Sequence, residues 1–133
     1  MPAPCTYDYA VIRVVPRVER EEFVNVGVIV SCPSKGFLAA RIEVDESRLQ
    51  ALDPAMDLEA VRAHLQTIPA ICAGGENAGP IGKLSPKERF RWLTAPRSTV
   101  IQTSPAHTGY LDDPERALER LVETMVRTRT TTT

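Results

Sequence analysis

Two apolar runs on either side of a short turn dominate the first third of the chain. Residues 23–32 are rich in valine, and residues 37–44 are again mainly apolar. The four residues between them, Pro-Ser-Lys-Gly, are typical turn formers. Because β-branched residues favour strands, two such runs around a short turn predict an antiparallel hairpin. By the two-residue period of a strand, one face of the first run is expected to carry Val24, Val26, Val28 and Val30.

Residues 7–15 are a third predicted strand, placed before the hairpin. Both of its faces are mainly apolar, which is typical of a central strand that is covered on both sides. Pro16 ends the run, because proline has no N–H to donate to a sheet ladder. Residues 98–103 are a fourth candidate strand. Within the hairpin, Asn25 and Gly27 interrupt the apolar pattern, and the glycine indicates a β-bulge or a close approach of two backbones.

Capping residues mark the starts of the predicted helices. Aspartate and serine accept hydrogen bonds from the free backbone N–H groups of a first helical turn. Helices are therefore expected to follow Asp45, Asp57, Ser85 and Asp113. The first should run to Leu52, the second should kink or end at Pro69, and the third should end near Leu93.

These elements predict an α+β fold: a mostly antiparallel sheet of about four strands with helices packed on one face. The chain has 133 residues, which is long enough to bury a core without disulfides or a metal. No repeat or interior linker divides it. Residues 1–126 are expected to form a single domain, and residues 127–133 a flexible, threonine-rich tail.

Composition narrows the classes of function. A net charge of −1 argues against a globally basic nucleic-acid-binding protein. Cys5, Cys32 and Cys72 are widely spaced, and with only His64 and His107 beside them they form no zinc motif. They are expected to be reduced thiols of a cytoplasmic protein. The sequence shows no signal-peptide pattern and no run of about 20 apolar residues that could cross a membrane.

Basic residues are concentrated in the segment 77–111. It holds five basic residues and one acid, Glu88, so its net charge is +4; the basic residues are Lys83, Lys87, Arg89, Arg91 and Arg97. Arginine forks bind phosphate or carboxylate, and nearby hydroxyl groups add donors. Trp92, the only tryptophan, could stack on a base or a guanidinium group. The alternative interpretation is a solvated helix face with Trp92 and Phe90 in the core.

Other motifs carry weaker signals. The glycine-rich residues 73–82 differ from a phosphate-binding loop, because Leu84 stands where serine or threonine is required. A tightly packed, flexible connection is one interpretation of this loop, and contact with a ligand is the other. Ser98 or Ser104 with His107 would supply a nucleophile and a base, but no motif of a known hydrolase surrounds them.

Arg13 and Arg41 lie within otherwise apolar predicted strands. A buried guanidinium group needs carboxylate or carbonyl partners, and the candidate carboxylates are Glu21, Glu22 and Glu43. Each arginine is therefore expected either at an exposed sheet edge or in a structural ion pair, or else facing a groove for a ligand or partner.

Four blocks of the sequence resemble a known family. They are residues 7–16 (YDYAVIRVVP), 22–28 (EFVNVGV), 78–82 (AGPIG) and 89–98 (RFRWLTAPRS). Together they are similar to the family called domain of unknown function 3037, over most of the chain up to the last helix. The family has no assigned activity. Its members are often encoded beside a kinase-like protein similar to HipA, the toxin kinase of a bacterial toxin–antitoxin pair, so the resemblance implies an accessory or regulatory role.

The sequence thus predicts a small binding or accessory module that acts with a protein partner, one that is kinase-like or a second copy of the chain. Its predicted ligand- or partner-binding surface consists of Arg89, Arg91, Arg97, Ser98 and His107. The bound group is expected to be anionic, and no metal or cofactor is expected. The rival hypotheses are an enzyme with a phosphate or nucleotide site, and a nucleic-acid-binding domain, both using the basic segment 83–107.

Overall fold

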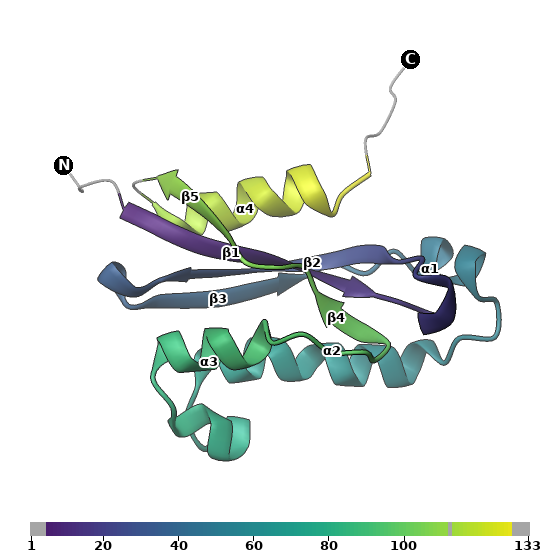
Figure 1. The fold of residues 1–133 in the computed structure, drawn as a ribbon, viewed down its shortest axis with the longest axis horizontal. Coiled ribbons are helices and arrows are strands. Elements are labelled where there is room, and N and C mark those ends of the chain that lie inside the picture. The colour runs from purple at the N-terminus through teal and green to yellow at the C-terminus, as the bar shows by residue number, and fades with distance from the viewer. Residues whose placement is uncertain (1–4, 112, 129–133) are drawn as a thin grey trace.

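A computed structural model describes residues 5–111 and 113–128 of the chain. Its centre is an antiparallel sheet in which the strands follow the order β3-β2-β1-β4, and β5 also pairs with β1 (Figure 1). The strands are β1 (Cys5–Val14), β2 (Val24–Cys32), β3 (Phe37–Ile42), β4 (Ile101–Thr103) and β5 (His107–Leu111). The predicted α+β class, the antiparallel sheet and the hairpin of β2 and β3 are confirmed.

Helices cover both faces of this sheet. The α-helices are α1 (Glu46–Leu52), α2 (Leu58–Ala73), α3 (Pro86–Leu93) and α4 (Pro114–Met125). Short 3-10 helices span Val18–Arg20, Pro33–Lys35 and Glu76–Lys83. Figure 1 shows α2 and α3 on one side of the sheet and α4 on the other. The prediction that the helices pack on one face is therefore wrong for α4, although the two apolar faces of β1 had already indicated a strand covered on both sides.

The predicted helix starts are confirmed by the caps. The carboxylates of Asp45, Asp57 and Asp113 accept backbone N–H groups in the first turns of α1, α2 and α4. At α3, the Ser85 hydroxyl accepts the Glu88 N–H at 3.2 Å and donates to the Glu88 carboxylate at 2.9 Å. This reciprocal pair is a capping box.

Of the two outcomes predicted at Pro69, a kink or an end of the helix, the second is wrong. The helix continues to Ala73 with Pro69 inside it. A proline removes one backbone hydrogen bond, but Ile68, Ile71 and Cys72 on either side of it are all buried in the core. Burial of these side chains outweighs the lost bond, because tertiary packing supplies most of the stability of a helix in a protein.

A β-bulge near Gly27 redistributes the valines of β2. Gly27 pairs with Ile12, but Asn25 pairs with the next residue of β1, so one residue of β2 is extra. A Cβ atom on Gly27 would lie 2.6 Å from the carbonyl oxygen of Arg41. The predicted bulge and close backbone approach are thus both confirmed. The prediction of one valine face is wrong, because Val24 and Val26 lie in one core cluster while the other holds Val28 and Val30.

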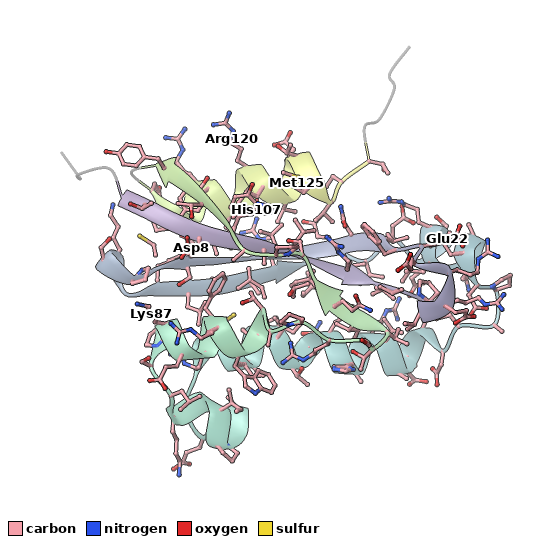
Figure 2. The ribbon with its side chains drawn as sticks, viewed as in Figure 1. Asp8, Glu22, Lys87, His107, Arg120 and Met125 are labelled. Carbon is pink, nitrogen blue, oxygen red and sulfur yellow. The ribbon has the colours of Figure 1, made fainter. Side chains whose placement is uncertain are left out.

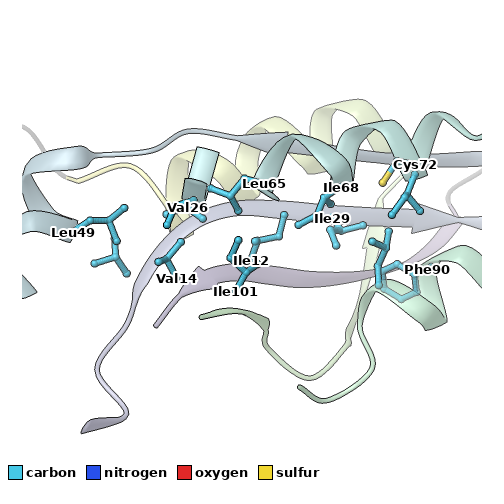
Figure 3. Close-up of a cluster of buried hydrophobic side chains, with 14 residues drawn as sticks. Ile12, Val14, Val26, Ile29, Leu49, Leu65, Ile68, Cys72, Phe90 and Ile101 are labelled. Carbon is cyan, nitrogen blue, oxygen red and sulfur yellow. The ribbon is translucent and has the colours of Figure 1, made fainter. Parts of the chain in front are cut away.

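The two core clusters differ in size. The larger lies between the sheet and α1, α2 and α3, as Figure 3 shows, and includes Ile12, Val14, Val26, Ile29, Leu49, Leu65, Ile68 and Phe90. The smaller lies beneath α4, where Val28 and Val30 of the sheet meet Leu118, Val122 and Val126. Half-buried Tyr7 and Tyr9 of β1 pack against it.

The edge beside β1 is formed by two short strands rather than the single strand predicted at 98–103. β4 pairs with the end of β1 and β5 with its beginning. Between them, the buried Ser104 donates its N–H to the Val11 carbonyl at 2.8 Å, and its hydroxyl accepts the Val11 N–H at 2.9 Å. Ser104 is therefore a structural bridge between the two strands.

The described chain ends just beyond α4. Arg127, the first residue of the predicted tail, donates hydrogen bonds to the carboxylates of Glu43, just after β3, and of Glu119 in α4. Thr128 is exposed, and residues 129–133 of the predicted tail lie outside the described residues. Of the helices in the described ranges, none combines the length and apolar character that crossing a membrane requires.

Candidate functional site

Arg89 lies inside the fold. It is 8% exposed, and its guanidinium group donates to three backbone carbonyls. Nη1 reaches the carbonyl oxygens of Ile71 and Cys72, each at 2.7 Å, and Nε reaches that of Leu84 at 3.1 Å. These carbonyls lie at the end of α2 and just before α3. Arg89 thus satisfies helix-end carbonyls and fastens α3 to α2, a structural role the charge pattern did not indicate.

Arg97 combines two contacts. Its Nη1 donates to the Leu93 carbonyl at 2.9 Å, and its Nη2 to the Trp92 carbonyl at 2.8 Å, so it caps the end of α3. Its guanidinium carbon also lies 4.7 Å from the centroid of the Trp92 ring, within cation–π range. Trp92 remains 42% exposed. The indole is therefore held in place by Arg97 while much of it faces solvent.

The remaining predicted site residues lie apart from one another. Arg91 is exposed on α3, and Ser98 is exposed just before β4. His107 begins β5, where its ring lies 5.5 Å from that of Tyr9. Figure 2 places His107 on the side of the sheet opposite Lys87 of α3. The structure thus brings Arg97 and Ser98 together, leaves Arg91 on the neighbouring helix, and separates Arg89 and His107 from them.

A cavity of about 310 Å³ joins Arg97 and Ser98 to Arg13 of β1. We refer to it as the Arg13 pocket; its lining is Arg13, Val15, Val18, Glu21, Phe23, Arg97, Ser98 and Gln102. Arg13 stands opposite Gln102 of β4 and Asn25 of β2 in the sheet. Its guanidinium carbon lies 4.1 Å from the centroid of the Phe23 ring. The central strand therefore contributes a positive charge to the lining of a partly apolar pocket.

The Arg13 side chain is incompletely satisfied. Its Nε is buried and has no hydrogen-bond partner among the described residues, and the same holds for Oδ1 of Asn25. Burial lowers the pKa of Arg13, because a charged group is less well solvated inside a protein. Glu21 lines the same pocket, and its backbone is left-handed, with φ at 58°. That conformation ends the 3-10 helix Val18–Arg20, where the Glu21 N–H donates to the Val18 carbonyl at 3.2 Å.

The two strand arginines, Arg13 and Arg41, have different surroundings. Arg41 pairs with Glu119 of α4, so its structural ion pair is confirmed, but with a partner outside the three predicted glutamates. Two of those glutamates are engaged elsewhere, Glu22 with Arg20 and Glu43 with Arg127. Arg13, in contrast, faces a pocket, the other outcome that the sequence had left open.

The thiols and the glycine loop show no sign of chemistry in the described residues. Cys32 and Cys72 are buried and free, and burial raises the pKa of Cys72 to about 12, so this thiol is protonated at neutral pH. No cluster of His, Cys, Asp and Glu in the described ranges has the form of a metal site. The glycine loop closes on itself through a 3.2 Å bond from the Gly75 N–H to the Gly82 carbonyl.

The fold defines a small α+β protein in which helices cover both faces of an antiparallel sheet, and Arg13 and Arg97 line one of its pockets. The model of one family, described as a protein of unknown function (DUF3037), matches residues 9–126. The chain belongs to this family, as its four sequence blocks had predicted. Comparisons with curated proteins and with solved structures found no match.

Proposed function

We propose that this domain is a non-enzymatic accessory module that binds a kinase-like protein similar to HipA, through a surface formed by Trp92, Arg91 and Arg97. We call this the Trp92 surface. The observation that carries the proposal is an indole that is 42% exposed and yet fixed by a stacked guanidinium group. The kinase-like partner is suggested by the resemblance described above.

The residue types suit a protein interface. Tryptophan and arginine supply much of the binding energy at protein–protein contacts, and they do so best when they are held rigidly before binding. Arg97 is held by carbonyls of α3, and it holds Trp92 in turn. A small cavity of about 60 Å³ beside them, lined partly by His64 and Ile68, gives the surface a recess for a partner side chain.

Charge indicates what the partner presents. Lys87 and Arg91 are exposed on α3, and no ion pair involves either of them within the described residues. The one acid of the helix, Glu88, accepts a hydrogen bond from the Ser85 hydroxyl and keeps its charge. Arg91 and Arg97 give the Trp92 surface two positive charges, and an acidic face of a partner complements it.

A binding experiment with a purified kinase-like protein similar to HipA tests the proposal. The purified chain should bind this protein, and Trp92→Ala and Arg91→Glu should each weaken the affinity by roughly tenfold or more in calorimetry. Arg120→Glu is the matched control, because Arg120 is exposed on α4 across the sheet (Figure 2). It should bind like the wild type.

The outcomes separate the rival functions. If the wild-type chain does not bind the kinase-like protein, the proposed partner is wrong. If it binds and all three variants bind equally well, the contact surface lies elsewhere. If the chain instead binds nucleic acid with an affinity that falls steeply with salt, the basic segment serves the nucleic-acid-binding alternative.

A further inference from the structure

We propose that the Arg13 pocket is a binding site for a small ligand that carries a carboxylate or phosphate group. This inference goes beyond the proposed partner contact, because the pocket opens between β1, β4 and the loop that precedes β2 rather than on α3. It concerns a small molecule, and it does not require the kinase-like partner.

Part of the hydrogen-bonding capacity of Arg13 is unused within the described residues. A guanidinium group has five N–H donors in a fixed fork, and burying such a donor without an acceptor is unfavourable. Nε of Arg13 is buried with no acceptor in the described residues, and the group packs on Phe23 instead of forming an ion pair. The rest of the fork also has no hydrogen-bond partner in the described residues, and Arg13 lines the pocket, so a carboxylate or phosphate oxygen there would accept from its Nη groups.

Further polar groups line the pocket beside Arg13. Arg97, Ser98 and Gln102 line the same pocket. The Gln102 side chain is held in place, because its Nε2 donates to the Thr99 carbonyl at 2.8 Å. Arg97 uses some of its donors on α3 carbonyls, yet its charge remains. Two arginines against one glutamate give the lining a net charge of +1, which favours an anion.

Apolar side chains complete the lining of the pocket. Val15, Val18 and Phe23 contribute carbon surface next to the charged groups. A volume of about 310 Å³ lies at the small end of ligand sites in proteins. A ligand with one anionic group and a short apolar body matches this combination. Glu21, also in the lining, would accept a hydrogen bond from a hydroxyl or amino group of that ligand.

The test uses the full chain and two probes, inorganic phosphate and benzoate, which represent the phosphate and carboxylate chemistries. Each is titrated against chloride at constant ionic strength, and the Nε–H signals of the arginine side chains are followed by NMR. The Arg13 signal should shift and saturate with at least one probe, while the Arg120 signal should not saturate. A saturable response to phosphate without a response to benzoate would show that the ligand carries a phosphate group. A saturable response to benzoate alone would show that it carries a carboxylate.

Variants then assign the site. Arg13→Lys keeps the charge but loses the fork and Nε, so it should weaken the responding probe by roughly tenfold. Ser98→Ala, at an exposed position, should weaken it less and keep the fold. Arg120→Gln should bind like the wild type. A titration in which neither probe saturates the Arg13 signal would overturn the proposal, and so would an unchanged affinity in a folded Arg13→Lys protein. If that variant does not fold, the wild-type titration and Ser98→Ala decide.

Discussion

The two faces of the sheet are covered in different ways. On one face, three helices and the sheet enclose a large apolar cluster, and Arg89 fastens α3 to α2 from within. On the other, the single helix α4 covers a small cluster and leaves Tyr7 and Tyr9 half-buried beside it. The difference shows that the two faces of one sheet can be stabilised differently. One face depends mainly on apolar burial, and the other combines a smaller apolar cluster with a few polar contacts.

Those polar contacts gather at the end of α4. The Asn25 amide donates to the Met125 carbonyl at 3.0 Å, and Arg48 donates to the Val126 carbonyl at 3.4 Å. Arg127 just beyond pairs with Glu43. Last-turn carbonyls have no partners within their helix, so these donors both satisfy them and fix α4 to the sheet and α1.

The largest expected effect is on the larger cluster. Leu65→Ala should lower the free energy of unfolding by about 3–5 kcal/mol, because Leu65 of α2 is fully buried and its removal leaves a cavity. Leu118→Ala, the matched change in α4, should cost about 2–3 kcal/mol, since a single covering helix can settle into the space. Urea unfolding measures both. Equal costs would contradict the proposed difference between the faces.

The second largest loss of stability is expected from replacement of the buried Arg89. Arg89→Met should destabilise the protein by about 2–3 kcal/mol, because three backbone carbonyls lose a charged donor. Arg91→Met, two residues away on the exposed side of α3, should stay within about 0.5 kcal/mol of the wild type. Thermal unfolding of the two variants checks this. Similar losses of stability in both would show that the burial of Arg89 does not make it more important for stability than Arg91.

A smaller and more local effect is expected at α4. Asn25→Ala should cost about 1 kcal/mol, because the Met125 carbonyl loses its donor. Amide hydrogen exchange should become faster in α4 while that of α2 stays the same, since local opening reports the stability of each region. Faster exchange throughout the chain would mean that the two faces unfold as one unit.

The smallest effect concerns pH. The Arg127 guanidinium group donates a hydrogen bond to Glu43 and holds the pKa of that carboxyl below its ordinary value. A carboxyl whose pKa is lower in the folded state stabilises the fold above its unfolded pKa, and this contribution is lost as the pH falls through the lowered folded value. Both side chains are partly exposed, so the change should be slight.

Urea midpoints measured from neutral to acidic pH give the test. The wild type should lose slightly more stability on acidification than Arg127→Gln, in which the carboxyl has lost its charged partner. An identical pH dependence in the two proteins would show that the Arg127–Glu43 ion pair does not help to stabilise the position of α4.

Local chemistry predicted much of the fold, and long-range pairing accounts for what it missed. Caps such as Asp45 and Ser85, and the turn between β2 and β3, depend on neighbours a few residues away, so their residues alone identify them. β5 (HTGYL) has no strong apolar alternation, and it is a strand because β1 lies beside it. The face covered by α4 likewise depends on where a distant helix docks.

In the candidate site, too, contacts between residues far apart in the sequence could not be predicted. Charge counting found the arginines of segment 83–107, but it could not find their acceptors, because every residue carries a backbone carbonyl. Arg89 is therefore indistinguishable by sequence from the exposed Arg91. Arg13 was noticed because a charge in an apolar strand is unusual, whereas Phe23 and Gln102 gave no signal until the fold placed them beside it.

The two short strands beside β1 have a consequence for how the chain folds. The meander β1-β2-β3 is made from neighbouring segments, but Ser104 meets Val11 across 93 residues, and Thr108 bonds to Asp8 across 100. During synthesis, β1 leaves the ribosome long before β4 and β5, the strands that fill its free side. Such late closure slows folding, and until then the nascent chain exposes an unpaired strand edge that another chain could join.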